Sequence, residues 1–552
     1  MKRISLLLLL AACCLASPAL RAKDVLTVDV IPRPALVETG KGTFRAAGAY
    51  FNCDPRIEVR TQRAIRALAD RITFVSGRTC SFASPVGLTP AAAESKRTKG
   101  FLFLKEEAMG DEGYSIDISP KACIVRAGGH NGFLYALQTL RQLMPVSIFG
   151  MQTDASEHFP IPCVKIADKP RFGYRGLLLD CSRHFYPVED IKKTLDLMLL
   201  FKMNRFHWHL TDDQGWRVEI KKYPRLTQVG AFRTGTMVGK DFDSNDGVRY
   251  GGYYTQDQMR EIVAYAEERG ITVIPEIDLP GHMQGALAAY PQLGCTGGPY
   301  TVRTTWGVSE EVLCAGKEAS YQFLEDVFTE LMDIFPSEYF HIGGDECPKK
   351  EWSQCPACQE RIRQLGLKAD GKHSAEVYLQ NYVTARVQKF LAEHGRKIIG
   401  WDEIFEGDLA EGATVMSWRG VESGQQAAAA GYDVIMTPKW YCYLNYLQSE
   451  DPSTEPLGHG HFLPLDKAYS YEPFEGLDAS AEGHILGVQA NMWTEYIATQ
   501  EHMEYMLLPR MVALAEVQWS PRDAKDYGRF YASLKRKGYE IFKQLGYNYR
   551  TY

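Results

Sequence analysis

Eight short apolar segments alternate with longer segments over residues 169–552, and few folds are compatible with this alternation. Several of the longer segments have helical spacing. In the clearest of them, Gln256–Glu268, residues Met259, Ile262 and Ala266 mark one face. Eight strand–helix units predict an α/β fold of the (β/α)8 TIM barrel type with insertions, and a doubly wound open sheet is the alternative. The predicted strands are Gly176–Asp180, Arg205–Leu210, Thr272–Glu276, Tyr339–Ile342, Lys397–Trp401, Thr414–Trp418, Asp433–Met436 and Ile485–Gln489.

Residues 24–168 have a different pattern and predict a smaller α+β domain in front of the barrel. Thr61–Val75 has helical spacing, and Tyr114–Ile118 is a short strand candidate. No concentrated set of catalytic residue types occurs in this part, so we expect a non-catalytic domain. Pro170 interrupts regular structure and marks the expected boundary, which leaves 169–552 as the catalytic domain.

The first 22 residues predict an export signal. Lys2 and Arg3 form a basic start, and the apolar stretch that follows is too short to cross a bilayer. Leu10–Cys13 also resembles a lipoprotein cleavage box that would make Cys13 the lipidated residue, whereas simple cleavage near Ala16 or Ala22 is the alternative. We therefore expect an exported protein of the periplasm or cell envelope, or a secreted one, with a membrane contact only through such an anchor.

Charge and cysteine content limit the possible partners and cofactors. The net charge of −6 gives no reason to expect nucleic acid as a partner. Of the 13 cysteines, Cys355 and Cys358 form a Cys-x-x-Cys pair near Cys347 that could be a metal or redox motif. No second such pair follows at zinc-ribbon spacing, so we expect a disulfide or free thiols there. Cys295 and Cys314 flank a Gly-rich loop and could staple it.

Acids, histidines and large aromatic residues follow almost every predicted strand. In a barrel these ends converge on one face, where active sites lie, so we expect a deep pocket for a polar ligand. The segments concerned are Asp180–His184, His209–Trp216, Glu276–His282, Gly343–Glu346, Trp401–Glu403, Trp418–Arg419, Trp440–Asn445 and Asn491–Glu495.

The adjacent acids Asp345 and Glu346 are the sharpest catalytic candidates. Two glycines before them allow a tight turn after a strand, and one acid beside another can raise a pKa toward that of a proton donor. Asp278 and His282 could orient each other or these acids. A pair of solvated loop acids is the alternative interpretation.

Two further groups extend the candidate site. His207 and His209 point to the same side of a strand and could hold a metal ion, as in barrel hydrolases that activate water. Asp212 and Asp213 could complete such a site or bind sugar hydroxyls. Aromatic residues at four different strand ends indicate walls around a substrate such as a sugar ring with an acetyl group; they are Trp401, Trp418, Tyr443 and Trp493.

Four motifs of this sequence resemble those of the β-N-acetylhexosaminidases of glycoside hydrolase family 20. They are Arg-Gly…Asp180-x-x-Arg-His-Phe, His-x-His-Leu-Thr-Asp-Asp-Gln-Gly-Trp216, Pro-Glu-Ile-Asp-x-Pro-Gly-His282 and His-Ile-Gly-Gly-Asp-Glu346. The resemblance covers nearly the whole chain after the signal, and residues 24–168 look like the non-catalytic N-terminal domain of that family. It implies an exo-acting, retaining enzyme that removes terminal N-acetylglucosamine or N-acetylgalactosamine from glycans.

The resemblance also implies roles for single residues. Glu346 would be the general acid and base, while Asp345 would hold the acetamido N–H as the substrate's own acetamido oxygen attacks the anomeric carbon through an oxazolinium-type intermediate. Asp278 and His282 would tune the two acids. The substrate-binding residues would be Arg175 for the sugar hydroxyls, Trp401, Trp418 and Trp493 around the acetamido group, Tyr443 on its oxygen, and Glu495 and Asn445 on outer hydroxyls.

One departure and two alternatives accompany this resemblance. Asn445 stands where many members have Asp, which weakens any prediction of gluco or galacto preference. A metal-dependent barrel hydrolase built on His207 and His209 and a non-catalytic glycan-binding protein are the alternative functions. The substrate-assisted reaction needs no cofactor and no metal, the expected partner is a glycan, and the sequence carries no prediction of oligomeric state.

Overall fold

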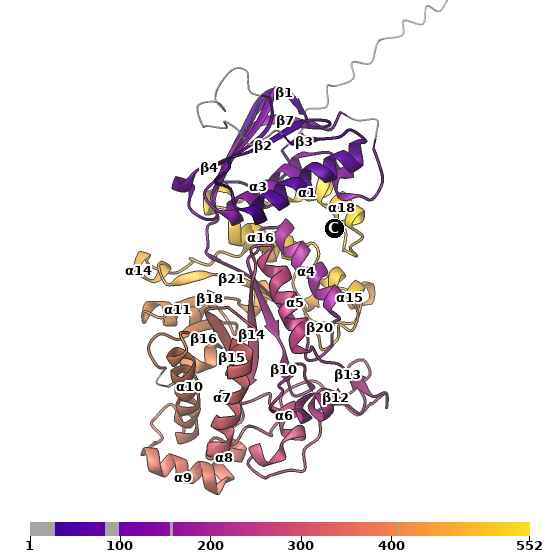
Figure 1. The fold of residues 1–552 in the computed structure, drawn as a ribbon. Coiled ribbons are helices and arrows are strands. Elements are labelled where there is room, and N and C mark those ends of the chain that lie inside the picture. Colours follow the sequence, from indigo (N-terminus) through magenta and orange to yellow (C-terminus); the bar gives the residue numbers. More distant parts are fainter. Residues whose placement is uncertain (1–27, 83–98, 155–157, 408) are drawn as a thin grey trace, which may run out of the picture.

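The computed structural model describes residues 28–82, 99–154, 158–407 and 409–552, which form two domains packed end to end (Figure 1). The predicted export signal, with Cys13, lies outside the described residues. In the N-terminal domain a seven-stranded sheet has the order β1-β7-β5-β6-β4-β2-β3. Its strands are β1 (Leu36–Arg45), β2 (Tyr50–Cys53), β3 (Ser81–Phe82), β4 (Gly100–Lys105), β5 (Tyr114–Ile118), β6 (Ala122–Ala127) and β7 (Pro160–Asp168).

Two helices, α1 (Val59–Ser76) and α3 (His130–Leu143), cover the side of this sheet that faces the barrel (Figure 1). Ile65, Leu68 and Ile72 lie on one face of α1 and are buried, as their spacing of three and four residues predicts. The helices thus form the middle layer of the molecule, between the sheet and the barrel.

The second domain is a closed barrel of eight parallel strands in the order β8-β9-β14-β15-β16-β17-β18-β21, which confirms the predicted fold. Closure is direct, because β21 pairs with β8 in a register that places Gln489 opposite Gly176. This pairing rules out the open sheet. The barrel strands are β8 (Tyr174–Asp180), β9 (Arg205–His209), β14 (Thr272–Leu279), β15 (Tyr339–Gly343), β16 (Lys397–Trp401), β17 (Thr414–Ser417), β18 (Val434–Met436) and β21 (Ile485–Met492).

The outer helices are long in the first four connections and short after β16, β17 and β18. The predicted helix at residue 256 is α5 (Gln256–Glu267), and Thr255 caps its start in a capping box with Gln258. Between β16 and β17 there is only the 3-10 turn η5 (Asp402–Phe405). The other main helices are α4 (Val188–Leu200), α6 (Gln284–Ala289), α7 (Glu318–Met332), α8 (Lys350–Gln354), α9 (Pro356–Leu365), α10 (Ala375–Glu393), α11 (Glu422–Ala429), α12 (Lys439–Cys442), α13 (Leu465–Ser470), α15 (Gln500–Leu507), α16 (Arg510–Trp519), α17 (Tyr527–Ser533) and α18 (Tyr539–Leu545).

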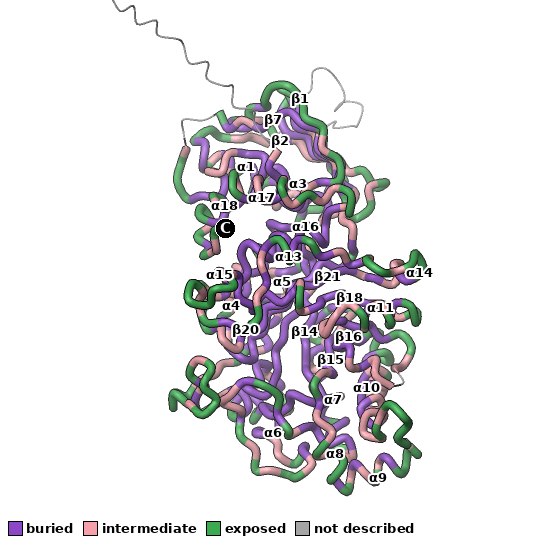
Figure 2. The backbone as a smooth tube through the Cα atoms, turned by 180° about the vertical axis from the view of Figure 1, so that it is seen from behind, coloured by how far each residue is buried: buried purple, intermediate pink, exposed green. Residues whose placement is uncertain are grey.

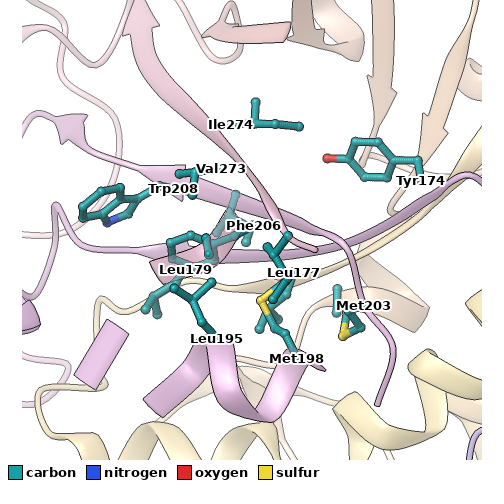
Figure 3. Packing of buried hydrophobic residues seen from close by; sticks show 14 of the residues in the cluster. Tyr174, Leu177, Leu179, Leu195, Met198, Met203, Phe206, Trp208, Val273 and Ile274 are labelled. Carbon is teal, nitrogen blue, oxygen red and sulfur yellow. The ribbon is translucent and has the colours of Figure 1, made fainter. Parts of the chain in front are cut away.

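Side chains of β8 alternate between the barrel interior and the outer layer. Leu177 and Leu179 point outward and pack with Leu195 and Met198 of α4 (Figure 3). All four are buried, and burial of a leucine side chain contributes about 1.5–3 kcal/mol. The tube view shows the buried strands at the centre of the barrel and the exposed loops at its margins (Figure 2). No helix among the described residues is long and apolar enough to cross a bilayer.

A buried polar seam joins the two domains. The Lys202 ammonium lies 3.1 Å from the carboxylate of Asp168, at the end of β7, and donates to the Tyr114 hydroxyl at 2.7 Å. The indole N–H of Trp519 donates to the same carboxylate at 3.0 Å, and the Lys202 Nζ lies over its ring. Because Lys202 and Asp168 are both fully buried, each depends on the other for compensation of its charge.

Candidate active site

The backbone after β15 turns sharply and brings two acids to the rim. Gly343 and Gly344 have φ angles of +65° and +99°, and a Cβ on Gly343 would lie 1.7 Å from the Asp278 carboxylate. Only glycine fits this turn. Glu346 and His282 themselves adopt φ angles of 44° and 52°, in a region that non-glycine residues rarely occupy. Such backbone strain clusters at functional sites.

Asp345 and Glu346 converge on one imidazole. The Nε2 atom of His282 lies 3.7 Å from Asp345 Oδ2 and 3.5 Å from Glu346 Oε2. The Asp345 side chain is 14% exposed and the Glu346 side chain 41% exposed, so the second acid is the one open to an incoming group. One oxygen of each acid lies within 4.8 Å of the other. The prediction that His282 contacts the acids therefore agrees with the geometry.

The two acids have opposite pKa shifts. Burial raises the pKa of Asp345 to about 7, an effect that His282 opposes and the neighbouring Glu346 increases. The pKa of Glu346 is lowered, mainly because His282 hydrogen-bonds its carboxylate, and burial acts in the opposite direction. The resemblance makes Glu346 the proton donor, and a proton donor needs a raised pKa. In the free protein the raised value belongs to Asp345.

Two further carboxylates contact the other ring nitrogen of His282. Its Nδ1 atom lies 3.2 Å from Asp212 Oδ1 and 3.3 Å from Asp213 Oδ2. Burial lowers the pKa of His282, but its carboxylate neighbours, Asp212 above all, raise it well above the usual histidine value. His282 is therefore a cation that faces acids on both sides.

Arg183 completes this group of charges at the end of β8. Its guanidinium lies 2.8 Å from Asp212 Oδ2 and 3.4 Å from Asp180 Oδ2, and it is placed over the Trp493 ring. The sequence motif contained Arg183, but no role was predicted for it. Its position after the strand, rather than in the strand, was the signal that could have identified it.

The barrel floor below the acids is a network around Glu276. The Glu276 carboxylate contacts His207 at 3.0 Å and His341 at 2.9 Å, and it accepts the Trp401 indole N–H at 2.9 Å. It also bonds His209, whose other ring nitrogen lies 3.1 Å from Asp212. Burial would raise the pKa of Glu276, but the three histidines hold it well below its usual range.

This network bears on the metal hypothesis for His207 and His209. His207, Glu276 and His341 are close enough together to bind one ion. However, both ring nitrogens of His209 face carboxylates, and these raise its pKa well above 6.5 even though burial acts the other way. A doubly protonated imidazole has no lone pair for a metal ion. His209 also lies with Glu276 and Asp278 in a group close enough to bind an ion, so a metal site at these histidines stays a hypothesis.

Four aromatic rings form a continuous wall beside the acids, as the sequence predicted. The Trp401 ring centroid lies 5.7 Å from that of Trp493, which lies 6.3 Å from that of Tyr443. Tyr443 stacks on Trp418 with an interplanar angle of 14°. Trp401, Trp493 and Tyr443 are buried and Trp418 is half-buried, so the wall closes toward the floor and opens at the rim.

Polar groups border this wall. Asn445 is buried, and its side-chain oxygen has no hydrogen-bond partner among the described residues. Burial raises the pKa of Glu495, while the Arg183 charge opposes the rise. Glu403, for which no role was predicted, accepts the Trp418 indole N–H at 3.0 Å. Burial, with Asp345 nearby, raises the pKa of Glu403 to about 9.

A polar cavity of about 200 Å³ opens beside Glu346. Glu346 and Glu403 line it together with Arg419, whose guanidinium lies 2.6 Å from the Glu406 carboxylate. The remaining lining comes from α10 and from the segment that follows Glu346. The cavity thus offers charged groups on the open side of the exposed acid.

The prediction that Arg175 lines the pocket is wrong. Arg175 is the second residue of β8, so it lies near the end of the barrel opposite to the acids, about 16 Å of strand away from Asp180. It also shares the outward face of Leu177 and Leu179. Its guanidinium lies 2.7 Å from Glu112 of the N-terminal domain and donates to the Tyr135 hydroxyl at 2.9 Å. Arg175 therefore belongs to the seam between the domains.

Comparison with known proteins agrees with this geometry. The sequence profile of the glycosyl hydrolase family 20 catalytic domain matches residues 172–522, and that of domain 2 of the same family matches residues 27–169. A beta-hexosaminidase of Porphyromonas gingivalis is 47% identical over 422 residues, which are 76% of this chain and 52% of the relative. This chain thus spans about half the length of that relative.

Two solved structures share the whole architecture. A GH20 exo beta-N-acetylglucosaminidase from Vibrio harveyi, in complex with N-acetylglucosamine, has a TM-score of 0.80 at 31% identity, covering 95% of this chain and 78% of that chain. A GH20 beta-N-acetylhexosaminidase from Streptomyces coelicolor has a TM-score of 0.80 at 30% identity and covers 95% and 98% of the two chains.

Proposed function

This chain belongs to glycosyl hydrolase family 20, and we propose that it is an exo-acting β-N-acetylhexosaminidase that retains the anomeric configuration by substrate-assisted catalysis. Its substrates are glycans that end in N-acetylglucosamine or N-acetylgalactosamine. The observation that carries the proposal is the convergence of Asp345 and Glu346 on His282, beside a wall of four aromatic rings.

The spacing of the acids supports retention. Carboxyl groups of inverting glycosidases stand about 6.5–9.5 Å apart because a water molecule must fit between one of them and the sugar. In this protein, oxygens of Asp345 and Glu346 lie within 4.8 Å of each other. In the proposed mechanism Glu346 donates the proton and Asp345 holds the acetamido N–H, so neither acid is left to act as the nucleophile. The attack from the other face is therefore assigned to the acetamido oxygen of the substrate.

In this mechanism Glu346 protonates the leaving oxygen and Asp345 accepts the acetamido N–H. The free protein has the opposite distribution, because its pKa shifts favour a proton on Asp345 and an ionised Glu346. Substrate binding reverses both shifts. The acetamido N–H stabilises the Asp345 anion, and the leaving group removes Glu346 from water. His282, in contact with both acids, stabilises the pair during this exchange.

The aromatic wall and its polar border support recognition of an N-acetylated sugar. Rings of Trp401, Trp493 and Tyr443 offer apolar faces to an acetyl methyl group. The acetamido oxygen is assigned to the Tyr443 hydroxyl. We assign the hydroxyl-binding role to Arg183 in place of Arg175, because Arg183 is fixed by two carboxylates at the rim. Glu495 and Asn445 are assigned to the outer hydroxyls.

The stereochemistry of the first product tests retention. Proton NMR of the reaction on an aryl N-acetyl-β-glucosaminide should show the β-anomer of N-acetylglucosamine first and the α-anomer only as mutarotation proceeds. Initial appearance of the α-anomer would contradict the mechanism.

A second series tests whether the substrate supplies the nucleophile. Successive fluorine atoms on the acetyl group weaken its carbonyl oxygen, so kcat should fall steeply along the series. A carboxylate nucleophile would leave kcat nearly constant, because the acetyl group would then take no part in bond formation. A protein that binds the glycosides without cleaving them would contradict the proposed function altogether.

A further inference from the structure

Four cysteines from two separate connections of the barrel lie close together. Cys295 and Cys314 belong to the connection after β14, and Cys355 and Cys358 belong to the connection after β15. All four are free thiols, and each sulfur atom lies within 4.8 Å of the other three. Cys314, Cys355 and Cys358 are buried and Cys295 is half-buried. The mechanism above uses none of them.

The spacing of the sulfurs matches a tetrahedral metal centre. Four thiolates that bind Zn²⁺ at about 2.3 Å lie at the corners of a tetrahedron with edges of roughly 3.8 Å. The sulfur separations here are 3.6 Å for Cys314–Cys358, 3.7 Å for Cys314–Cys355 and 3.9 Å for Cys295–Cys358. A disulfide needs about 2.05 Å. We propose that these four cysteines form a structural site for one Zn²⁺ ion, with four thiolate ligands and no open position.

The backbone around the cluster is arranged for thiolates. Cys355 is the residue before α9, Pro356 is the first residue of that helix, and Cys358 lies in its first turn. Free N–H groups and the positive end of the helix dipole therefore face the sulfurs. The Gly316 N–H hydrogen-bonds Cys314. Only glycine fits at Gly316, because a Cβ there would lie 2.2 Å from the Ala357 carbonyl carbon.

Charge near the cluster is also favourable. Zn²⁺ with four thiolates carries a net charge of −2, since the ion displaces four thiol protons. The Lys317 ammonium donates to the carbonyl oxygens of Gln292 at 2.9 Å and Gly294 at 2.6 Å, beside Cys295. No carboxylate is among the four candidate ligands. An all-sulfur site of this kind selects a soft ion over Ca²⁺ or Mg²⁺.

The site would fix the segment that carries the catalytic acid. Residues 346–355 run from Glu346 to the first cysteine of the Cys-x-x-Cys pair, and the Trp352 indole N–H donates to the Leu313 carbonyl at 2.9 Å. The Leu313 N–H in turn donates to the Pro280 carbonyl at 2.9 Å, next to the turn that holds His282. The ion would thus join the Glu346 loop to the His282 loop. Its role is positional and not catalytic.

Metal analysis of the purified full chain tests the site. We expect about one zinc per chain, and at least a tenfold lower content in the double variant Cys355→Ser/Cys358→Ser. The matched control is Cys53→Ser, a half-buried cysteine of the N-terminal domain, which should keep its zinc. On the unmodified protein, titration with a mercurial thiol reagent should release the ion in step with reaction of four thiols.

Cobalt substitution reports the ligand set independently of activity. Co²⁺ in place of Zn²⁺ should give the intense visible bands of a tetrahedral, thiolate-bound ion, and the double variant should lack them. Three results would each overturn the proposal: full zinc content in the double variant, disulfide-linked pairs among the four cysteines in the freshly purified protein, or no uptake of added Zn²⁺ or Co²⁺ by the reduced chain. The glycosidase mechanism would be unaffected by any of them.

Discussion

Replacement of Glu346 by Gln isolates proton donation from folding. The Glu346 side chain is 41% exposed, and its carboxylate contacts only His282 among the ionic partners found for it. The loss of this single, partly exposed ionic contact should change the free energy of unfolding by about 1 kcal/mol or less. General acid catalysis contributes about 10²–10⁴-fold to the rate, or about 2.7–5.5 kcal/mol of barrier. The loss in rate should therefore appear without a loss of stability.

The size of the rate loss depends on the leaving group of the substrate. With a chitobiose substrate the departing sugar oxygen needs a proton, so kcat/KM of Glu346→Gln should fall by the full factor of about 10²–10⁴. With a dinitrophenyl glycoside the departing phenolate needs little help, so its formation should slow by less than about tenfold. Hydrolysis of both substrates should be followed at one pH, together with thermal unfolding of each variant.

A neighbouring acid supplies the control. Glu406 lines the same cavity and is ion-paired with Arg419, so Glu406→Gln should change the two substrates equally and only slightly. A Glu346→Gln variant that loses the same factor on both substrates would refute the assignment of Glu346 as the acid. A large drop in its unfolding temperature would refute the claim that this side chain is structurally neutral.

Two further predictions follow from the electrostatics and from the corrected arginine. The active form of the acid pair holds one proton, which rests on Asp345 with a pKa of about 7 in the free protein. The value of kcat/KM should therefore fall as the pH rises through about 7. In the Asp345→Asn variant this fall should move to lower pH, and an unchanged rate of the unmodified protein from pH 7 to 9 would contradict the reasoning. The Arg175→Ala variant should keep its KM for aryl glycosides within about twofold. It should destabilise the protein by about 3–5 kcal/mol, because the Glu112 carboxylate loses its ion-pair partner. A tenfold rise in KM with unchanged thermal unfolding would show that Arg175 contacts the substrate after all.

The barrel could be predicted because its strands are short, apolar and separated by helical segments. All eight predicted strands overlap observed ones, and the predicted helix at Gln256 begins at that residue because Thr255 caps it. Each of these features depends on local patterns of two to four residues.

The sequence predicts only those site residues that directly follow a recognisable strand. Asp345, Glu346 and the aromatic wall follow strands directly, so the barrel rule places them. Arg175 was misassigned because the whole motif was taken to lie at the rim, although Arg175 is the second residue of β8 and only the last residues of the motif follow the end of that strand. The contact with His282 determines which of the two acids has the raised pKa, and this contact is not visible in the local sequence. The contact between Cys295 and Cys358 depends on the packing of two loops, which the local sequence does not show either.

The polar seam at Lys202 makes the two domains mutually dependent. Its ammonium has no exposure, and the carboxylate that compensates it, Asp168, is supplied by β7 of the N-terminal sheet. A barrel cut free of that sheet would lose the partner of Lys202 and expose to water the apolar surface of α4 that α3 covers, and each apolar side chain so exposed would cost about 1.5–3 kcal/mol. The companion domain therefore contributes to the stability of the barrel, and engineering that transplants the barrel must bring the sheet with it.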